Sequence, residues 1–460
     1  MRRVEKHIDL LEGSIASALT RLALPLMGTS LIQMAYNLTD MLWIGRLGAG
    51  AVASVGTAGM FLWLGNSLNT LARVGGQVCV GHSVGARKQE DAAHYAQASI
   101  QMTALIGLIL GALFVLGAAP LISFFRLNGA GVIADAEGYL RVVGGVILLG
   151  LLANTLTALI TATGNSSTPF LATAMGLIAN MVLDPILIFG LAGAPRMGVL
   201  GAAVATAAAQ ALVAALLILY CAKDALLRCA NPFRKPAFAC VREILRLSAP
   251  VVVQNLVFPL VSMIIARMVA VYGDAAIGAQ KVGTQIESIS WMTADGYGMA
   301  LNSFIAQNRG AGNLHRANRG YLTSFKIVSL WGIFTTLLLV FCAGPIFRIF
   351  IPQKSVLPIG VSYLTAQGWS QLFMCLEIVT VGAFNGYGIT VLPAAVDIIL
   401  TVLRVPMAMA LSRTALKLSG IWWSISISSI AKGVIITSAF LLMLKRQKKN
   451  LPEEPAVKTE

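Results

Sequence analysis

Charged residues are scarce in this sequence. Only 12% of its 460 residues are Asp, Glu, Lys or Arg, whereas 57% are hydrophobic, and the mean hydropathy is +0.79. Because soluble domains carry about 25% charged residues, this composition excludes a soluble protein. Alternation of apolar and polar residues at the period of a strand is also missing, which excludes a membrane β-barrel. The apolar runs extend over about 20 residues, enough for a helix to cross the bilayer.

Several motifs that would indicate catalysis or ATP use are absent. The six cysteines form no CxxC pair and the four histidines are scattered, so we expect structural thiols and no metal site. No GxxxxGK[ST] loop occurs, which argues against a self-contained ATP-driven pump. An aspartate-rich motif and a polar catalytic loop are missing too, which argues against the alternative of a membrane-embedded transferase. We therefore expect no enzyme activity, no catalytic residues and no organic cofactor.

The basic residues follow the topology of a membrane protein. The net charge is +15, and about 21 Lys and Arg fall in alternate loops on one side of the predicted membrane, against about 8 on the other. This bias predicts cytoplasmic N- and C-termini and a multi-pass protein of the cell membrane, in a bacterial inner membrane. The basic stretch 228–246 is expected to contact membrane lipid, and no nucleic-acid partner is expected. Because the first span is long and follows a leader with basic and acidic residues, we expect it to be an uncleaved first helix.

Apolar segments predict twelve transmembrane helices in two groups of six. Their expected positions are about residues 15–44, 52–82, 93–118, 138–163, 169–191, 199–222, 247–272, 276–306, 321–343, 358–384, 392–412 and 418–444. We divide the chain into an N-lobe (1–222), a basic cytoplasmic linker (223–246) interrupted by Pro232 and Pro236, a C-lobe (247–445) and a cytoplasmic tail (446–460).

The two lobes read as repeats of one another. At an offset of about 225 residues, LALP at 22–25 matches LSAP at 247–250, Gly48 matches Gly273, and Gly85-Ala86 matches Gly310-Ala311. Since each repeat has an even number of helices, both have the same topology and are related by a pseudo-two-fold axis along the membrane normal. The expected fold is an all-α polytopic membrane protein in which two six-helix lobes form a V around a central cavity.

Two aspartates in the N-lobe are the leading candidates for a functional site. Asp40 and Asp184 each lie in an apolar span without a basic residue within two turns on the same helix. An aspartate in the bilayer core costs about 2.5–3.5 kcal/mol, so both are expected to face protein or a wet cavity. Neutral polar residues accompany them at helical spacing. These are Gln33, Tyr36 and Asn37 beside Asp40, Asn180 one turn before Asp184, and Thr206 and Gln210 in the sixth span.

Such a group of side chains could bind either protons or a small cation, and the sequence does not distinguish these two functions. Protonated carboxyl groups can share hydrogen bonds with the neighbouring amides and hydroxyls, whereas ionised ones are hard ligands for a cation such as sodium. A purely structural pair is the remaining alternative. Met34 and Met60 are candidates for an adaptable cavity wall, with ordinary helix packing as the alternative. Pro25 is expected to bend the first helix.

The C-lobe contains more intramembrane charges than the N-lobe. Their roles are left open between substrate contact, structural pairing and reaching the membrane interface. Asp397 and Arg404 are two turns apart on one face and are expected to pair, Lys281 is a candidate partner for Glu287, and Lys432 is a candidate to reach the interface. The secondary site candidates are Glu287, Asp295, Glu377, Asp397 and Arg404.

Taken together, these features resemble the multidrug and toxic compound extrusion (MATE) family over residues 10–445. Within it, the chain is most similar to the branch named for the DNA-damage-inducible F protein (DinF-like). That resemblance implies an N-lobe coupling site in which protonation or sodium binding bends the first helix at Pro25. The positions that match the coupling residues of this branch are Asp40, Asn180, Asp184 and Thr206.

The resemblance implies a secondary antiporter that exports organic, amphipathic, cationic compounds in exchange for H⁺ or Na⁺ by alternating access. The coupling ion is then the only cofactor, the partners are small organic substrates and membrane lipid, and a monomer is sufficient. A flippase for lipid-linked oligosaccharides, from the same superfamily, is the alternative. It would need a basic cavity, for which Arg73, Arg267 and Arg404 are the candidates.

Overall fold

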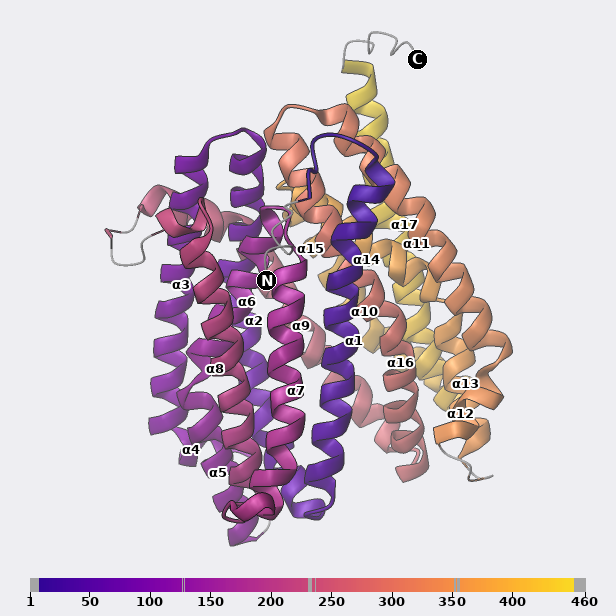
Figure 1. Ribbon diagram of the computed structural model, residues 1–460. Helices are drawn as coiled ribbons and strands as arrows, with labels where there is room; N and C mark the ends of the chain where they lie inside the picture. Colours follow the sequence, from indigo (N-terminus) through magenta and orange to yellow (C-terminus); the bar gives the residue numbers. More distant parts are fainter. Residues whose placement is uncertain are drawn as a thin grey trace.

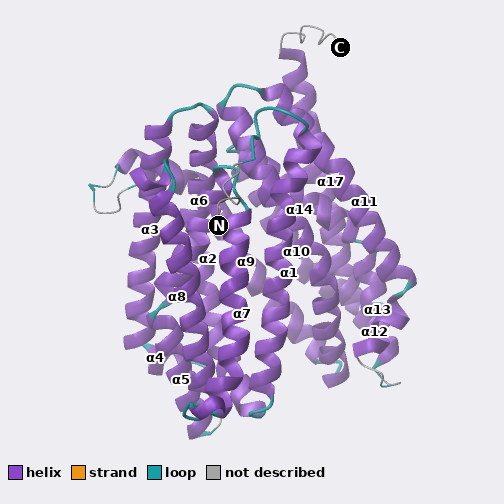
Figure 2. Cartoon of the chain, in the orientation of Figure 1, coloured by secondary structure: helices purple, strands orange, loops and turns teal. Residues whose placement is uncertain are grey.

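The computed structural model of the protein describes residues 8–125, 127, 129–230, 234–235, 237–350, 353 and 356–450, without the side chains of Asn37, Leu38, Ala49, Ala192, Asp274 and Asn450. Every regular element in these ranges is a helix (Figures 1 and 2). The predicted linker prolines Pro232 and Pro236 and most of the predicted tail lie outside the described residues.

The described residues of the first half of the chain form eight α-helices. They are α1 (Ile15–Gly45), α2 (Ala49–Gly85), α3 (Gln89–Leu116), α4 (Ala118–Ser123), α5 (Ala130–Gly145), α6 (Ile147–Ala162), α7 (Ser167–Phe189) and α8 (Val199–Lys223). Those of the second half form nine. They are α9 (Phe238–Ala270), α10 (Asp274–Gly310), α11 (Leu314–Phe341), α12 (Ala343–Phe350), α13 (Leu357–Gly368), α14 (Gln371–Gly386), α15 (Val391–Val402), α16 (Arg404–Ser412) and α17 (Lys417–Asn450).

These helices account for all twelve predicted spans. Nine helical segments in the described ranges are long and apolar enough to cross a membrane, and the bent pair α5–α6 makes a tenth. The more polar α10 and the pair α13–α14 occupy the two remaining positions. The predicted all-α polytopic architecture is therefore confirmed.

Several predicted boundaries are wrong. The fourth span is α5 and α6, which meet at 47° after the pair Gly144-Gly145. The eleventh, predicted at 392–412, is confirmed as Val391–Ser412, with a single turn residue, Leu403, between α15 and α16. The tenth breaks after Gly368. The predicted linker 223–246 is shorter than expected, because α9 already begins at Phe238.

The two halves of the chain form two helix groups that lie side by side (Figure 1). Contacts between them come mainly from α1 and α2 of the first half and α9 and α10 of the second. The groups meet at the end of the molecule where α1 begins and α17 ends, called the termini end below. Towards the opposite end their ribbons diverge, as the predicted V requires.

Glycines permit the close contact at the termini end. A Cβ atom on Gly85, the last residue of α2, would collide with the carbonyl oxygen of Gln307 in α10. A Cβ atom on Gly310, the last residue of α10, would collide with the carbonyl oxygen of His82 in α2. Of the repeated glycines noted in the sequence, Gly85 and Gly310 thus lie where the backbones of the two halves touch, whereas a Cβ atom on Gly48 or Gly273 would have no neighbour within 4 Å.

Candidate functional site

The structure brings the candidate N-lobe residues together from three helices. Asp40 lies in α1, Asn180 and Asp184 lie in α7, and Thr206 lies in α8; α1 packs against α7, and α7 packs along α8. Asp184 and Asn180 are buried, with 0% and 1% of their surface exposed. The two aspartates lie close enough to interact electrostatically. The polar residues that the sequence places at helical spacing in α1, α7 and α8 thus lie near one another in the structure.

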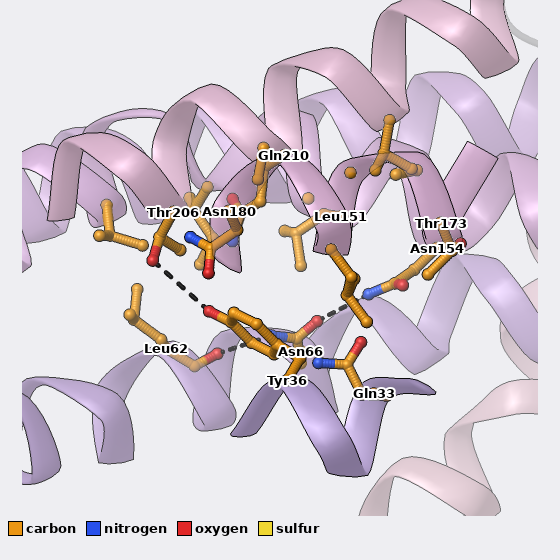
Figure 3. A pocket seen from close by; sticks show the side chains of 18 of the residues that line it. Gln33, Tyr36, Leu62, Asn66, Leu151, Asn154, Thr173, Asn180, Thr206 and Gln210 are labelled. Atoms are coloured by element: carbon orange, nitrogen blue, oxygen red, sulfur yellow. Dashed lines mark hydrogen bonds between the residues drawn. The ribbon is translucent and has the colours of Figure 1, made fainter. Parts of the chain in front are cut away.

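Asn180 connects the acidic group to α8. With its amide nitrogen turned towards Asp184, Asn180 donates to Asp184 Oδ2 at 2.9 Å and accepts from the backbone N–H of Thr206 at 3.1 Å. The Thr206 hydroxyl lies 3.5 Å from the hydroxyl of Tyr36 in α1 (Figure 3). A single network of neutral groups therefore joins α1, α7 and α8 around the aspartates.

The aspartates themselves are incompletely bonded. Oδ1 of Asp40 and Oδ1 of Asp184 are both buried and accept no hydrogen bond from the described residues. No Lys or Arg in the described ranges forms an ion pair with either one. Burying an ionised carboxylate without a partner is strongly unfavourable, so these oxygens favour a proton or a small cation.

A cavity of about 540 Å³ lies beside this network within the first half of the chain. Its walls come from α1, α2, α5, α6, α7 and α8 (Figure 3). No lining residue among those described is charged, and the polar part of the wall consists of amides, hydroxyls and an indole. The polar lining residues are Gln33, Tyr36, Trp63, Asn66, Asn154, Thr157, Thr173, Asn180, Thr206 and Gln210.

Of the predicted cavity residues, Gln33, Tyr36 and Gln210 line this cavity. Met34 and Met60 lie outside its lining: the Met34 sulfur accepts from Ser288 in α10 at 3.7 Å, and Met60 is 52% exposed. The side chain of Asn37 lies outside the described part of the structure. The coupling and cavity roles of all these residues remain predictions.

Sequence reasoning missed four polar residues of the cavity. Asn66 in α2 and Asn154 in α6 face each other, and Asn154 donates to Asn66 Oδ1 at 2.9 Å. Thr157 and Thr173 complete the set. Each is a single uncharged polar residue in an apolar helix, so no spacing pattern marks it. The available signal was weaker: an asparagine in a membrane span needs a hydrogen-bonding partner.

Pro25 lies inside α1, which continues through it as one helix. The Thr29 hydroxyl donates to the Pro25 carbonyl oxygen at 3.0 Å, and the Ser30 hydroxyl donates to the Leu26 carbonyl oxygen at 3.3 Å. A proline removes one N–H from the helical ladder, and hydroxyl groups nearby can satisfy carbonyls there. The bending of α1 at this proline remains a prediction.

The C-lobe charges form a separate, internally paired cluster. Lys432 in α17 donates to Asp397 Oδ1 at 2.6 Å and lies 3.3 Å from Glu377 Oε1. The predicted pair of Asp397 with Arg404 is therefore wrong as a direct contact, because Arg404 instead donates to the hydroxyls of Ser428 and Ser429. Lys432 does not reach the interface, since only 4% of it is exposed.

The two acids of α10 have different surroundings. Glu287 accepts from the hydroxyl of Tyr363 at 3.0 Å, which replaces the predicted partner Lys281. Asp295 interacts electrostatically with Arg73 of α2, across the contact between the halves. Neither these residues nor Glu377, Asp397 and Arg404 line the cavity described above.

Comparison with known proteins agrees with this architecture. The sequence profile of the MatE family matches the chain twice, over residues 25–186 and 250–410. The chain belongs to the MatE family. One match lies in each half of the chain: the first falls on α1 to α7 and the second on α9 to α16. Membership makes the protein a membrane transporter rather than an enzyme.

MatE relatives from several bacteria align over most of their length. The chain is 28% identical to the probable multidrug resistance protein NorM of Thermotoga maritima over 412 residues, which cover 89% of this chain and 88% of that protein. It is 25% identical over 391 residues to an FAD transporter of Shewanella oneidensis, covering 83% of this chain and 84% of that one.

Solved MatE structures share the fold. The outward-facing conformation of a multidrug resistance MATE family transporter superimposes with a TM-score of 0.84 at 22% identity, covering 97% of this chain and 100% of that chain. A MATE protein in the bent conformation gives a TM-score of 0.85 at 22% identity, with 97% and 99% covered. At this identity, the likeness concerns the fold alone.

Proposed function

We propose that the protein is a secondary antiporter that exports amphipathic organic cations in exchange for inward H⁺ or Na⁺. The observation that carries the proposal is the position of Asn180. This residue lines the cavity and, on its other side, hydrogen-bonds to Asp184. A change in the charge of Asp184 would therefore alter a side chain that touches a bound substrate, which is the direct coupling an antiporter needs.

The cavity fits the proposed substrate class. About 540 Å³ is within the range that holds drug-sized molecules. Its neutral amides and hydroxyls can hydrogen-bond to many polar groups, while the apolar wall and the Trp63 ring accept flat surfaces. Relatives whose names refer to multidrug resistance support this substrate range.

The available driving force is adequate. One cation that moves inward down 100 mV supplies about 2.3 kcal/mol, and a tenfold concentration ratio adds about 1.4 kcal/mol. In this proposal the cation binds where the unpartnered oxygens of Asp40 and Asp184 lie. We further propose that the termini end is cytoplasmic, that the chain works as a monomer in the cell membrane, and that it belongs to the DinF-like branch.

The test is efflux of a fluorescent organic cation from proteoliposomes, with a proton gradient and a sodium gradient imposed separately. Asp40→Asn and Asp184→Asn are expected to abolish gradient-driven efflux, and the productive gradient identifies the ion. Glu90→Gln is the matched control, because Glu90 is an exposed acid at the start of α3. Gradient-driven efflux that survives both aspartate variants would refute the N-lobe coupling site.

The flippase alternative has less support. A pyrophosphate needs basic groups in its binding cavity, yet none of Arg73, Arg267 and Arg404 lines the cavity in the first half. If the wild-type protein moves no organic cation under either gradient, scrambling of a fluorescent lipid-linked pyrophosphate in the same vesicles becomes the decisive assay.

A further inference from the structure

A short segment ahead of α1 crosses from one half of the protein to the other. Residues 8–14, called the strap here, run without regular secondary structure over the termini end. The backbone N–H of Ile8 donates to the carbonyl oxygen of Gly164, in the turn between α6 and α7 of the first half, at 3.1 Å. The next residues of the strap contact α10 and α11 of the second half.

The second half binds the strap through two side chains. Arg316 in α11 donates from Nε to the carbonyl oxygen of Leu10 at 3.0 Å, from one terminal nitrogen to Gly13 at 2.8 Å and from the other to Glu12 at 2.6 Å. Asn308 in α10 adds a bond to the Leu10 carbonyl at 3.0 Å. One guanidinium group therefore holds three backbone carbonyl oxygens within four residues, an arrangement that suits the planar fork of donors of an arginine better than the single ammonium of a lysine.

The strap is an ordered part of the fold. The Asp9 carboxylate accepts from the backbone N–H groups of Leu11 at 2.8 Å and Glu12 at 3.1 Å, which shapes the strap locally. The Leu10 side chain is 1% exposed and packs in the same cluster as Phe304 and Tyr321. The position of the strap thus depends on packing against the second half of the protein, while the backbone of Ile8 connects the strap to the first half.

Two further hydrogen bonds join the halves at this end. Gln307 in α10 donates to the Ala162 carbonyl at the end of α6 at 2.7 Å, and Nε2 of His82 in α2 lies 2.8 Å from the Gly386 carbonyl at the end of α14. The two bonds are equivalent under the repeat offset of about 225 residues. They form a symmetric pair. The segment before α9, which corresponds to the strap, is bound by neutral side chains instead: the carbonyl oxygens of Lys235 and Arg234 accept from Gln97 and Gln101 of α3 at 3.2 and 2.7 Å.

Comparison of the repeats shows that the arginine that binds the strap occurs in one repeat only. At the offset of about 225 residues, Asn308 corresponds to Ser83 and Arg316 to Asp91. Asp91 pairs with Lys88 on its own segment at 3.9 Å. The equivalent crevice, which Ser83 and Asp91 line, is a cavity of about 300 Å³. The arginine anchor is therefore present in one repeat, and the two-sided contacts of the strap lie where the halves meet.

We propose that the strap is a latch that holds the termini end closed, with Arg316 as its anchor. Separation of the halves at this end must break either the bond of Ile8 to Gly164 or the three Arg316 hydrogen bonds, so loss of the anchor removes the tie and lets the halves separate there more often. The proposal rests on the proposed function in one respect: alternating access requires this end to open during the cycle.

The test is hydrogen–deuterium exchange of the full-length protein in lipid nanodiscs, without substrate or gradient. Arg316→Met keeps the apolar stem but removes all three donors. It is expected to speed amide exchange about tenfold or more in residues 77–85 and 303–311, the contacting ends of α2 and α10. Arg319→Met, an exposed arginine on the same helix, is the matched control and should leave both segments unchanged.

Faster exchange confined to the strap would overturn the proposal, because the strap would then be a bound terminus without control over the closure. If Arg316→Met loosens every helix, Asp9→Ala decides: it removes the local bonds of an exposed residue and should still speed exchange at the α2 and α10 ends. Wild-type exchange there would refute the latch. Since no transport is measured, this outcome is independent of the antiporter assay.

Discussion

Replacement of Lys432 by Met should destabilise the second half of the protein strongly. The lysine ammonium lies 2.6 Å from Asp397 Oδ1 and 3.3 Å from Glu377 Oε1, and the three residues are only 4%, 4% and 7% exposed. Without the lysine, two carboxylates remain buried next to each other with no cation in contact. Removal of one partner from a buried ion pair costs about 3–5 kcal/mol, so we expect a loss of that size.

Two further variants separate charge from packing. Asp397→Asn leaves Lys432 paired with Glu377, so its expected cost is smaller, about 1–3 kcal/mol. Combined with Lys432→Met, it leaves a single carboxyl group that can take up a proton, so the double variant should be more stable than the sum predicts by about 1–3 kcal/mol. Lys445→Met, on the exposed end of α17, is the control and should change stability by less than about 0.5 kcal/mol.

The assay is the unfolding equilibrium in mixed detergent micelles with increasing sodium dodecyl sulfate, followed by tryptophan fluorescence. A loss below about 1 kcal/mol for Lys432→Met would refute the view that this lysine stabilises the fold by neutralising the two acids. Efflux by the folded fraction should still follow the same ion gradient as the wild type. Loss of gradient dependence would instead assign the cluster a part in coupling.

Three other outcomes are expected. Asn180→Ala should uncouple efflux from the ion gradient while the protein still binds the fluorescent cation, measured by fluorescence anisotropy, because it removes the group shared by cavity and acid. Gly85→Val should abolish transport and speed exchange at the α2 end, since its side chain would meet the Gln307 carbonyl; Gly56→Ala, with open space beside it, should not. Tyr363→Phe should cost about 1 kcal/mol in the unfolding assay, through loss of its bond to Glu287.

Features that depend on one helix or on the repeat were predictable from the sequence. Asn180 and Asp184 share a face because they are four residues apart, and the structure keeps them hydrogen-bonded. The matched glycines Gly85 and Gly310 marked the contact between the halves, because a backbone approach needs a residue without a side chain. Breaks of a helix within a single span could not be predicted in this way, because the hydropathy profile changes little across the glycine residues at which the helix is interrupted.

Contacts between helices were not predictable. Lys432 reaches an acid 35 positions away on another helix, whereas Asp397 and Arg404 looked like a pair because they are close in sequence. Whether a charge at the end of a long side chain reaches the interface or a buried partner depends on the packing of the neighbouring helices. The strap was missed for the same reason: its role depends on hydrogen bonds to Asn308 and Arg316, which lie about 300 positions away in the sequence.

The buried acidic residues of the two halves differ in what neutralises their charge. In the second half, Glu377 and Asp397 share Lys432, so their charge is largely neutralised within the protein whatever the ion concentration. In the first half, Asp40 and Asp184 have no such cation among the described residues, and each retains an oxygen without a bond. Only an acid whose neutralisation depends on an exchangeable proton or cation can respond to a gradient. This difference, on one shared scaffold, is the physical reason for our proposal that ion coupling lies in the first half of the chain.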